Sequence, residues 1–473
     1  MGFSFCPLFF QLNWVKITTM KQVHISTFGC QMNDRDSELM AQVLSAHDYR
    51  LTERPEEADL ILINTCSIRQ KAEEKTYSLL GRLKRLKTRN PGLIIGVGGC
   101  VAQQEGDRLL ERIPHLDLVF GTRRINELPE MIQTVSRQGR RLAAVGLDRL
   151  VRYAPSERAF RSSPVKASVT VMHGCNNYCA YCVVPYVRGP EWSRPDHEIV
   201  AEVRHLAAQG VREVLLLGQN VNSYGAPVRN GGPAFVDLLE QLEAVAGLKR
   251  LRFTTSHPKD LSPALIHRFG RLSKLCEHIH LPFQAGSNAV LARMNRGYTR
   301  EMYIERIRTL REHCPEIAVT SDVMVGFPGE KPADFEETLD LIREVEFDDL
   351  FSFRYSDRAP ARASGFPDKV PEEEKRRRLA QLQALQKGIT LARNRAQEGT
   401  RQDVLVEGVS KKSPREWTGR TRTNKVVNFT AVDMEAGRTV AVDIEKGYAH
   451  SLKGTLAPPD LEGRRQEDSC CCG

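Results

Sequence analysis

"HGCNNYCAYCVVPY", residues 173–186, sets Cys175, Cys179 and Cys182 in the spacing C-x3-C-x2-C, with no fourth cysteine nearby. Four thiolates normally hold a four-iron cluster, so three on one loop can hold three irons and leave the fourth open to an outside ligand. Structural zinc is the alternative, but such zinc sites use four protein ligands. Only His173 lies close in sequence, and nothing obvious completes a zinc set. The spacing therefore favours an iron–sulfur cluster.

The cysteine loop follows the first of six apolar runs between residues 165 and 355. The runs are "KASVTVM", "EVLLLG", "LRFTT", "HIHLPF", "IAVTSDVMV" and "LFSFRYS". Helical patterns such as "PDHEIVAEVRHLAAQG" separate them. Six strand–helix repeats with right-handed crossovers predict a partial (β/α)6 barrel that is open on one side. Barrel folds place their chemistry at the carboxyl ends of their strands, and this loop follows such an end.

A second cysteine trio lies nearer the N-terminus. The runs "QVHISTFGC", "DLILINTCS" and "GLIIGVGGC" place Cys30, Cys66 and Cys100 at strand ends, 36 and 34 residues apart. That interval is about one βαβ unit, and helices are expected over residues 35–46 and 70–86. Ligands bind at the carboxyl edge of parallel sheets. We therefore expect the three cysteines to converge on one rim.

The residue pattern changes in the C-terminal part of the chain. Leu379, Leu382, Leu385, Ile389 and Ala392 have helical spacing and predict an amphipathic linking helix. Beyond residue 400, the short alternating runs "DVLVEGV", "KVVNFTAV" and "TVAVDIEKG" predict a small antiparallel β barrel of OB type.

The whole chain is thus predicted to be an α/β protein of several domains. The expected segments are an extension over 1–20, a parallel-sheet α/β domain over 21–150, the partial barrel over 160–370, the linking helix over 371–399, the small barrel over 400–457 and a disordered tail over 458–473.

Composition narrows the class of protein. Lys+Arg 68 against Asp+Glu 59 gives +9 over 473 residues, which is weak evidence for nucleic acid unless the charge is concentrated. No apolar run reaches the ~20 residues that span a bilayer. The start lacks a basic region and a small-residue cleavage site, so translation from Met20 and a cytoplasmic location are expected. Twelve cysteines in so long a chain favour metal ligation over a disulfide framework.

The loop C-x3-C-x2-C, with Tyr181 before its third cysteine, resembles the signature of radical S-adenosylmethionine (SAM) enzymes. In that superfamily the open iron binds the amino and carboxylate groups of SAM. An electron from the cluster then cleaves SAM to a 5′-deoxyadenosyl radical that abstracts hydrogen from substrate. The cofactor does the chemistry and the protein positions it.

Further stretches resemble the methylthiotransferases of this superfamily, over residues 20–456. They are "STFGCQMN", "NTCSIRQKAEEK", "GGCVAQ", "LLLGQNVNSYG", "TTSHP", "LPFQAGSNAVLARMNRGYT", "VMVGFPGE" and "GRTRTNKVVNF". The resemblance implies an auxiliary [4Fe-4S] cluster on Cys30, Cys66 and Cys100, and a SAM-binding [4Fe-4S] cluster on Cys175, Cys179 and Cys182. It also implies that the small barrel is an RNA-binding barrel of TRAM type.

The implied reaction uses two SAM molecules, one as methyl donor and one as radical source, and places methylthio on C2 of an adenosine beside the anticodon of tRNA. The "TTSHP" and "RTNK" stretches favour the branch that acts on N6-isopentenyladenosine. The base must leave its stack, which is easy in a single-stranded loop. The implied partners are tRNA and an electron donor such as flavodoxin or ferredoxin, and we expect a monomer with no membrane contact.

Four polar residues at strand ends, together with Tyr181 of the cysteine loop, are candidates for contact with SAM or the base. The four are Gln219, Asn220, Ser256 and Gln284, and the backbone of residues 325–330 is expected to shape the adenine site. The alternative for each is a polar group satisfied locally. Cys276 and Cys314 are predicted to be small buried side chains rather than ligands, and His257 a loop histidine.

Basic residues gather between positions 411 and 425, with Glu416 as the single acid. They are Lys411, Lys412, Arg415, Arg420, Arg422 and Lys425. Trp417 lies among them, and small β barrels often bind RNA. We predict that Lys411, Lys412, Arg420, Arg422 and Lys425 contact tRNA, with an ordinary solvated surface as the alternative.

One stretch departs from the family pattern. Where a Ser-x-Arg-x-Gly-Thr type segment is expected after the last barrel strand, this chain has "YSDRAPARASGF", without the Gly-Thr. This departure leaves open which base the protein recognises. The alternatives within enzymes are methylthiolation of a ribosomal-protein aspartate or of threonylcarbamoyladenosine in tRNA. The alternative of another class is a non-catalytic iron–sulfur RNA-binding protein.

Overall fold

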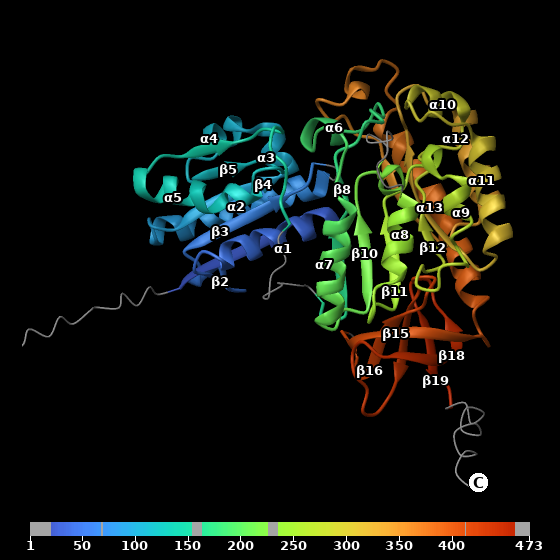
Figure 1. The fold of residues 1–473 in the computed structure, drawn as a ribbon. Coiled ribbons are helices and arrows are strands. Elements are labelled where there is room, and N and C mark those ends of the chain that lie inside the picture. Colours follow the sequence, from blue (N-terminus) through green and yellow to red (C-terminus); the bar gives the residue numbers. More distant parts are fainter. Residues whose placement is uncertain (1–19, 68–69, 154–162, 226–234, 412, 459–473) are drawn as a thin grey trace, which may run out of the picture.

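The computed structural model describes residues 20–67, 70–153, 163–225, 235–411 and 413–458. A parallel sheet with its helices lies beside a partial barrel, and a small closed barrel lies at the far end of the partial barrel (Figure 1). The expected N-terminal extension and disordered C-terminal tail fall almost wholly outside the described residues.

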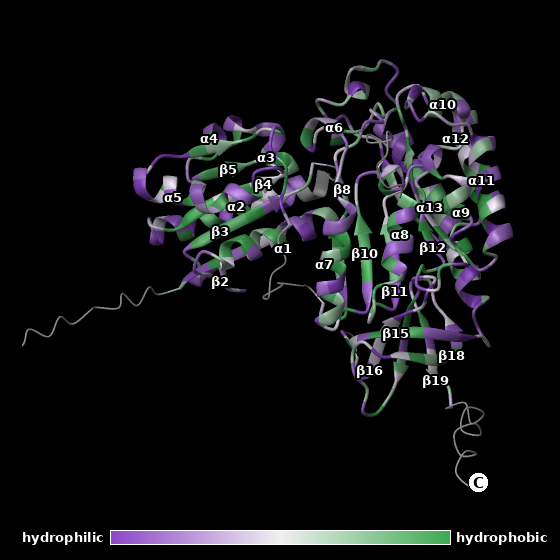
Figure 2. Ribbon diagram, viewed as in Figure 1, coloured by the Kyte–Doolittle hydropathy of each residue, from purple (hydrophilic) through white to green (hydrophobic). Residues whose placement is uncertain are grey.

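Six parallel strands form the N-terminal sheet in the order β2-β1-β3-β4-β5-β6. They are β1 (Lys21–Thr27), β2 (Tyr49–Leu51), β3 (Leu60–Thr65), β4 (Ile94–Gly99), β5 (Leu118–Phe120) and β6 (Leu142–Ala144). The central strands β3 and β4 are buried along their whole length, which explains their continuous apolar runs, and β3 is drawn in the hydrophobic colour in Figure 2.

Helices cover both faces of this sheet. The core on one face includes α1 (Gln31–Ser45) and α5 (Leu128–Gln138), and the core on the other includes α2 (Gln70–Arg89), α3 (Cys100–Glu105) and α4 (Asp107–Arg112). The two predicted helices are confirmed, but α1 begins four residues and ends one residue earlier than predicted, and α2 ends three residues later. Cys30 precedes α1, Cys66 follows β3, and Cys100 begins α3. The predicted placement of the three cysteines on one carboxyl edge is therefore confirmed.

The central part holds the six predicted strands, all parallel. They are β7 (Lys166–Thr170), β10 (Glu213–Leu217), β11 (Arg250–Thr254), β12 (His278–His280), β13 (Ala318–Val325) and β14 (Asp349–Arg354). They form two sheets, β11-β10-β7 and β12-β13-β14, and a bridge between Leu251 and Leu275 joins β11 to the segment before β12. The curved result is the predicted partial barrel (Figure 1).

Helices surround the partial barrel, and a hairpin of two short strands encloses the cysteine loop. The helices are α6 (Val184–Val187), α7 (Asp196–Ala208), α8 (Phe235–Glu243), α9 (Pro263–Ile266), α10 (Asn288–Arg293), α11 (Arg300–His313) and α12 (Pro332–Val345). The hairpin consists of β8 (Met172–His173) and β9 (Trp192–Ser193). Short 3₁₀ turns are η1 (Pro55–Glu57), η2 (Ile125–Glu127), η3 (Val221–Ser223), η5 (Pro258–Asp260) and η6 (Arg362–Gly365). Cys276 and Cys314 are buried, as predicted.

The C-terminal barrel is closed in the order β15-β16-β17-β19-β18. Its strands are β15 (Arg401–Ser410), β16 (Ser413–Arg420), β17 (Val426–Thr430), β18 (Thr439–Gly447) and β19 (Leu452–Leu456). The barrel is antiparallel as predicted except for one pair, since β17 and β19 run parallel. In the described part of the chain, no helix combines the length and apolar composition needed to cross a bilayer.

The linking helix α13 (Glu372–Arg395) is confirmed, but its buried face is more polar than predicted. Leu382 is buried, whereas Ala392 is exposed. The buried row also contains Lys375 and Arg378, and the Arg378 guanidinium lies 2.6 Å from the Glu330 carboxylate. Apolar periodicity could not reveal this face, because its polar side chains are satisfied by partners on other elements.

Candidate active site

Both cysteine trios line the same cavity, which has a volume of about 1010 Å³. One trio comes from the loop between β8 and α6, and the other from the rim of the N-terminal sheet. None of the eight cysteines in the described segments forms a disulfide. Among the described residues, no three His, Cys, Asp or Glu side chains are grouped to hold a single metal ion. Each thiolate of an iron–sulfur cluster binds a different iron, so a cluster does not require its three thiolates to surround a single ion.

His173 is committed to structural contacts. Its Nε2 lies 2.8 Å from the Tyr153 hydroxyl, and its ring stacks on Tyr153 and on Trp192, with centroids 5.8 and 6.1 Å away. Burial lowers the pKa of His173 well below the ordinary value, so the ring is neutral at pH 7. His173 therefore supports the start of the cysteine loop rather than completing a zinc set.

A buried arginine lies against the first trio. Arg296 Nη1 is 3.4 Å from Cys179 Sγ and 3.3 Å from the Tyr181 hydroxyl. Burial raises the pKa of Cys175 to about 11 and that of Cys182 to about 12, so both thiols hold their protons until a metal replaces them. The fixed charge of Arg296 therefore lies directly beside the Cys179 sulfur. Arg296 was not among the predicted site residues, although it lies in the "MNRGYT" stretch.

The second trio begins with an acidic thiol. The pKa of Cys30 is lowered to about 6, chiefly by a hydrogen bond with Cys66, and Arg188 and two backbone amides add to this against the effect of burial. At Gly29 a Cβ atom would lie 2.6 Å from the Cβ of Cys66, and its φ is +147°. Only glycine therefore allows the ends of β1 and β3 to approach so closely.

Arg188 connects the elements that support the two cysteine trios. It was also not predicted from the sequence. Its Nη2 lies 2.7 Å from the Asp36 carboxylate on α1, and the two residues are 4% and 1% exposed. The backbone around Arg188 is held as well, since Thr122 Oγ1 donates to Val187 O at 2.7 Å. Arg188 Nη1 is buried and has no hydrogen-bond partner among the described residues. Its charge thus faces the second trio with a donor to spare.

Four of the five candidate SAM-contact residues line the cavity, namely Tyr181, Gln219, Ser256 and Gln284. Gln219 Oε1 accepts a hydrogen bond from Gly174 N at 2.5 Å, which ties the end of β10 to the cysteine loop. Asn220 does not line the cavity, and its Nδ2 donates to Asp260 at 2.8 Å, while its buried Oδ1 has no partner among the described residues. Contact with SAM stays a prediction for all five residues.

Several buried polar atoms at this site have no partner within the described segments. They include Gln219 Nε2, Ser256 Oγ and His257 Nε2. Buried polar atoms are nearly always hydrogen-bonded, so a set of unpartnered ones around a cavity fits a polar ligand such as SAM. His257 is a loop histidine, as predicted, but it is buried and lines the cavity. Burial lowers its pKa far below the usual range, so it is neutral.

The loop over residues 325–330 is shaped by its own glutamate. The Glu330 carboxylate accepts from Gly326 N at 3.0 Å and from Arg378 at 2.6 Å. This loop does not line the cavity. Its role in binding adenine stays a prediction.

The stretch that departs from the family pattern lies between the two trios. Ala363 N donates to Ala180 O in the first cysteine loop at 2.7 Å, and Ala361 packs in one cluster with Cys100. Arg358 pairs with Glu73 of α2 at 3.0 Å. The changed loop therefore contacts the supports of both trios.

Comparison with known families matches all three folded parts. Residues 22–121 match the uncharacterized protein family UPF0004, residues 169–342 the radical SAM superfamily and residues 395–457 the TRAM domain.

A tRNA-2-methylthio-N(6)-dimethylallyladenosine synthase from Syntrophobacter fumaroxidans is 52% identical over 440 residues, 92% of this chain and 96% of that protein. One from Geobacter metallireducens is 52% identical over 441 residues, 93% of this chain and 99% of that protein. This chain belongs to that family. The predicted assignment to radical SAM methylthiotransferases, and with it the prediction of an enzyme, is confirmed.

A solved structure supports the fold. A radical SAM methyltransferase, TsrM from Kitasatospora setae, aligns with a TM-score of 0.54 at 14% identity, covering 73% of this chain and 74% of that one. Membership of the radical SAM family confirms the expectation of [4Fe-4S] clusters and SAM as cofactors. Two sets of three cysteines without disulfides line one cavity, with unpartnered polar atoms beside them, and this arrangement fits these groups.

In this family member, two of the five candidate RNA-contact residues form ion pairs that dock the small barrel on the partial barrel. Arg422 pairs with Glu277 at 2.7 Å and Lys425 with Asp348 at 2.8 Å. Arg420 pairs with Glu407 at 3.2 Å within the small barrel itself. Lys411 is exposed, and Lys412 lies outside the described residues. Contact of these residues with tRNA stays a prediction, and Arg420 and Lys425 do line the cavity.

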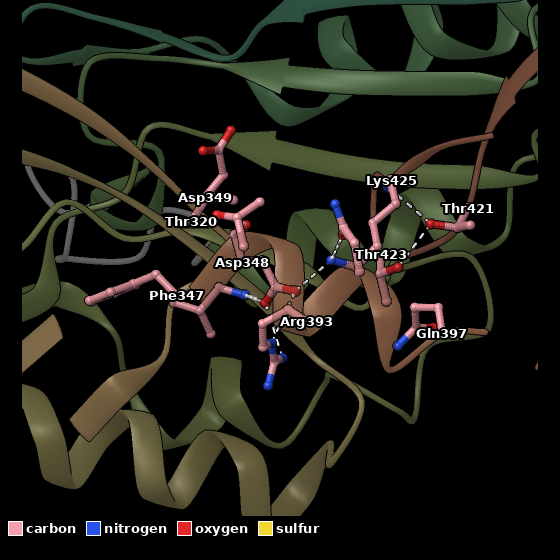
Figure 3. A network of polar contacts seen from close by, with 12 residues as sticks. Thr320, Phe347, Asp348, Asp349, Arg393, Gln397, Thr421, Thr423 and Lys425 are labelled. Carbon is pink, nitrogen blue, oxygen red and sulfur yellow. Dashed lines mark hydrogen bonds and ion pairs between the residues drawn. The ribbon is translucent and has the colours of Figure 1, made fainter. Parts of the chain in front are cut away.

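Asp348 is the centre of this docking contact. It lies between Arg393 of α13 and Lys425 of the small barrel (Figure 3), at 3.2 and 2.8 Å. Val319 N also donates to its carboxylate at 3.0 Å. Burial alone would raise the pKa of Asp348, but Lys425 and Arg393 lower it below its ordinary value. One carboxylate thus joins β13, α13 and the small barrel.

Replacing Asp348 by alanine should destabilise the protein by roughly 3 kcal/mol, because two partly buried cations and an amide lose their acceptor. Thermal unfolding and proteolysis at the junction after α13 measure this loss. The matched control is Asp340→Ala, which removes an exposed pair with Arg343 and should change stability by less than about 1 kcal/mol. Equal effects of the two substitutions would contradict the docking role.

Proposed function

We propose that this protein installs a methylthio group at C2 of N6-isopentenyladenosine beside the anticodon of tRNA. The observation that supports it most is that two cysteine trios, from distant parts of the chain, line one cavity. The relatives named as tRNA-2-methylthio-N(6)-dimethylallyladenosine synthases support the same substrate.

In this proposal Cys175, Cys179 and Cys182 hold the SAM-binding cluster, and Cys30, Cys66 and Cys100 the auxiliary cluster. When bound, these groups and SAM supply the radical that removes hydrogen, the methyl group and the sulfur. Arg296 and Arg188 place fixed positive charges beside the two trios, which favours thiolates and anionic clusters.

The remaining residues of the cavity position the substrates. Gln219, Ser256 and His257 offer unpartnered polar atoms to SAM. The lumen below them is polar, with His278, His280, Thr320 and Asp322 along it. Barrel interiors are usually filled by branched apolar side chains, so a polar, open lumen favours a role in binding a polar substrate such as a flipped base.

Further parts of the proposal concern organisation and partners. We assign the α/β unit to residues 21–150, the radical SAM unit to 160–370, the linking helix to 371–399 and the TRAM unit to 400–457. The reaction needs an electron donor such as flavodoxin or ferredoxin. We further propose that the protein acts as a monomer in the cytoplasm, where tRNA is modified.

The test is mass analysis of tRNA nucleosides from cells that lack this protein. We expect the 2-methylthio group to be lost while the isopentenyl group remains on adenosine. Loss of methylthio from threonylcarbamoyladenosine, or from a ribosomal-protein aspartate, would instead support one of the alternative substrates. Unchanged modification everywhere, with no SAM cleavage by the reduced protein, would support a non-catalytic iron–sulfur RNA-binding protein.

A further inference from the structure

Helix α2 presents an exposed face of positive charge. Lys75, Arg82, Arg85 and Arg89 are all exposed and follow one another at intervals of seven, three and four residues. That spacing places them on one side of a helix, along about 21 Å of its axis. We name these four residues the α2 cationic face.

No counter-charge accompanies this face. From Lys75 to Arg89 the sequence contains no Asp or Glu, and the two glutamates of α2, Glu73 and Glu74, lie near its start. Within the described residues, none of the four cations forms an ion pair or a side-chain hydrogen bond. Arg89 in the last turn suits the helix dipole, but the dipole does not explain Lys75 or Arg82.

Several exposed arginines on other helices have a paired carboxylate. Four of them, on α11, α12 and α13, each pair with a carboxylate three residues earlier: Arg308 with Glu305, Arg343 with Asp340, Arg376 with Glu373 and Arg377 with Glu374. These exposed faces of α11, α12 and α13 are therefore mixed in charge. On the α2 cationic face, by contrast, the like charges repel one another unless an acidic partner binds there.

The face begins at the active site and leads away from it. α2 starts four residues after Cys66, which lines the cavity. Glu73 in its first turn pairs with Arg358 at 3.0 Å, in the segment that packs between the two cysteine trios. A substrate inserted in the cavity and extending outward along α2 would meet four cations in succession.

We propose that the α2 cationic face binds the phosphate backbone of the base-paired stem next to the tRNA loop that enters the cavity. This inference rests on the proposed function. Phosphates are regularly spaced anions, and lysine and arginine contacts with them position a nucleic acid without reading its sequence. Paired RNA is recognised mainly through its backbone, which suits a row of cations with no aromatic side chain among them. The alternative occupant of this face, from another class of macromolecule, is an acidic electron-transfer protein.

The experiment compares two charge-matched variants of the cluster-loaded enzyme. K75Q/R82Q/R85Q/R89Q removes the α2 cationic face, and R308Q/R343Q/R376Q/R377Q removes the same number of charges from the other helices. Affinity is measured over a range of salt for a tRNA that carries isopentenyladenosine and for an oligonucleotide of its anticodon loop alone. Iron content and far-UV circular dichroism check that each variant is folded.

We expect the α2 variant to bind tRNA at least tenfold more weakly near 0.1 M salt. The slope of log K against log salt should decrease by about 3, in line with the loss of three or four phosphate contacts. Binding of the loop oligonucleotide should be unchanged, and the charge-matched variant should bind tRNA within about threefold of wild type. The single variants R82Q and R85Q should each lower the slope by about 1.

Equal weakening by the two charge-matched variants, or none by the α2 variant, would overturn the proposal. Unchanged tRNA binding with weaker binding of reduced flavodoxin would assign the face to an electron donor instead. Failure of the proposed function is distinguishable, because wild-type enzyme would then leave isopentenyladenosine in the loop oligonucleotide unmodified.

Discussion

Alanine at Cys66 should abolish methylthiolation of tRNA while the reduced enzyme still cleaves SAM. Cys66 belongs to the trio on the N-terminal rim, and the SAM-side loop with Cys175, Cys179 and Cys182 is a separate set of ligands. Removing one of three ligands should empty the auxiliary site, so iron per chain should fall to about half. Product should fall by more than a factor of about 100, because the site of sulfur insertion is lost. Iron analysis, release of 5′-deoxyadenosine and nucleoside mass spectrometry measure the three quantities.

The matched substitution is Cys179→Ala, in the SAM-side trio. It should also halve the iron, but it should remove SAM cleavage together with methylthiolation. Cys276→Ala is the control for thiol loss, since this cysteine is buried and lies outside the cavity lining, and it should keep the full iron content. Loss of SAM cleavage in the Cys66 variant would contradict the division of the six cysteines into two independent sites.

The convergence of the cysteines could be predicted because it follows from local structure. A cysteine at the carboxyl end of each of several parallel strands must lie on one edge of the sheet, whatever else the domain does. To predict that Cys30, Cys66 and Cys100 lie on one edge, it was enough to recognise the three strands that precede them. The partial barrel and the small barrel were likewise predicted from alternation and length.

The charged supports of the site could not be predicted in this way. Arg188 and Asp36 are 152 residues apart, and Arg296 and Cys179 are 117 apart, so each contact depends on how separate elements dock. The contact of Lys425 could not be predicted from the sequence either. In the sequence it belongs to a basic run typical of an RNA surface, but in the structure its ammonium group is paired with Asp348. Periodicity reports which face of an element is apolar and says nothing of which charges are paired across domains.

Replacing Arg188 by alanine should lower the free energy of unfolding by about 3–5 kcal/mol, the usual effect of leaving one member of a buried ion pair alone. Asp36 is 1% exposed and its Oδ1 already has no partner among the described residues, so water cannot readily replace the guanidinium. Because Asp36 is on α1 and Arg188 follows α6, the loss should also loosen the contact between the two cysteine-bearing units. Urea unfolding and hydrogen exchange of α1 measure the two effects.

The double variant Arg188→Met with Asp36→Leu separates charge from packing. It removes both charges and keeps apolar volume, so it should recover a large part of the lost stability. The surface control Arg54→Ala removes an exposed pair with Glu57 and should change stability by less than about 1 kcal/mol. If the double variant were as unstable as Arg188→Ala, the pair would act through shape rather than charge. Should stability return without methylthiolation, Arg188 must also serve the auxiliary site directly, as its unpartnered Nη1 suggests.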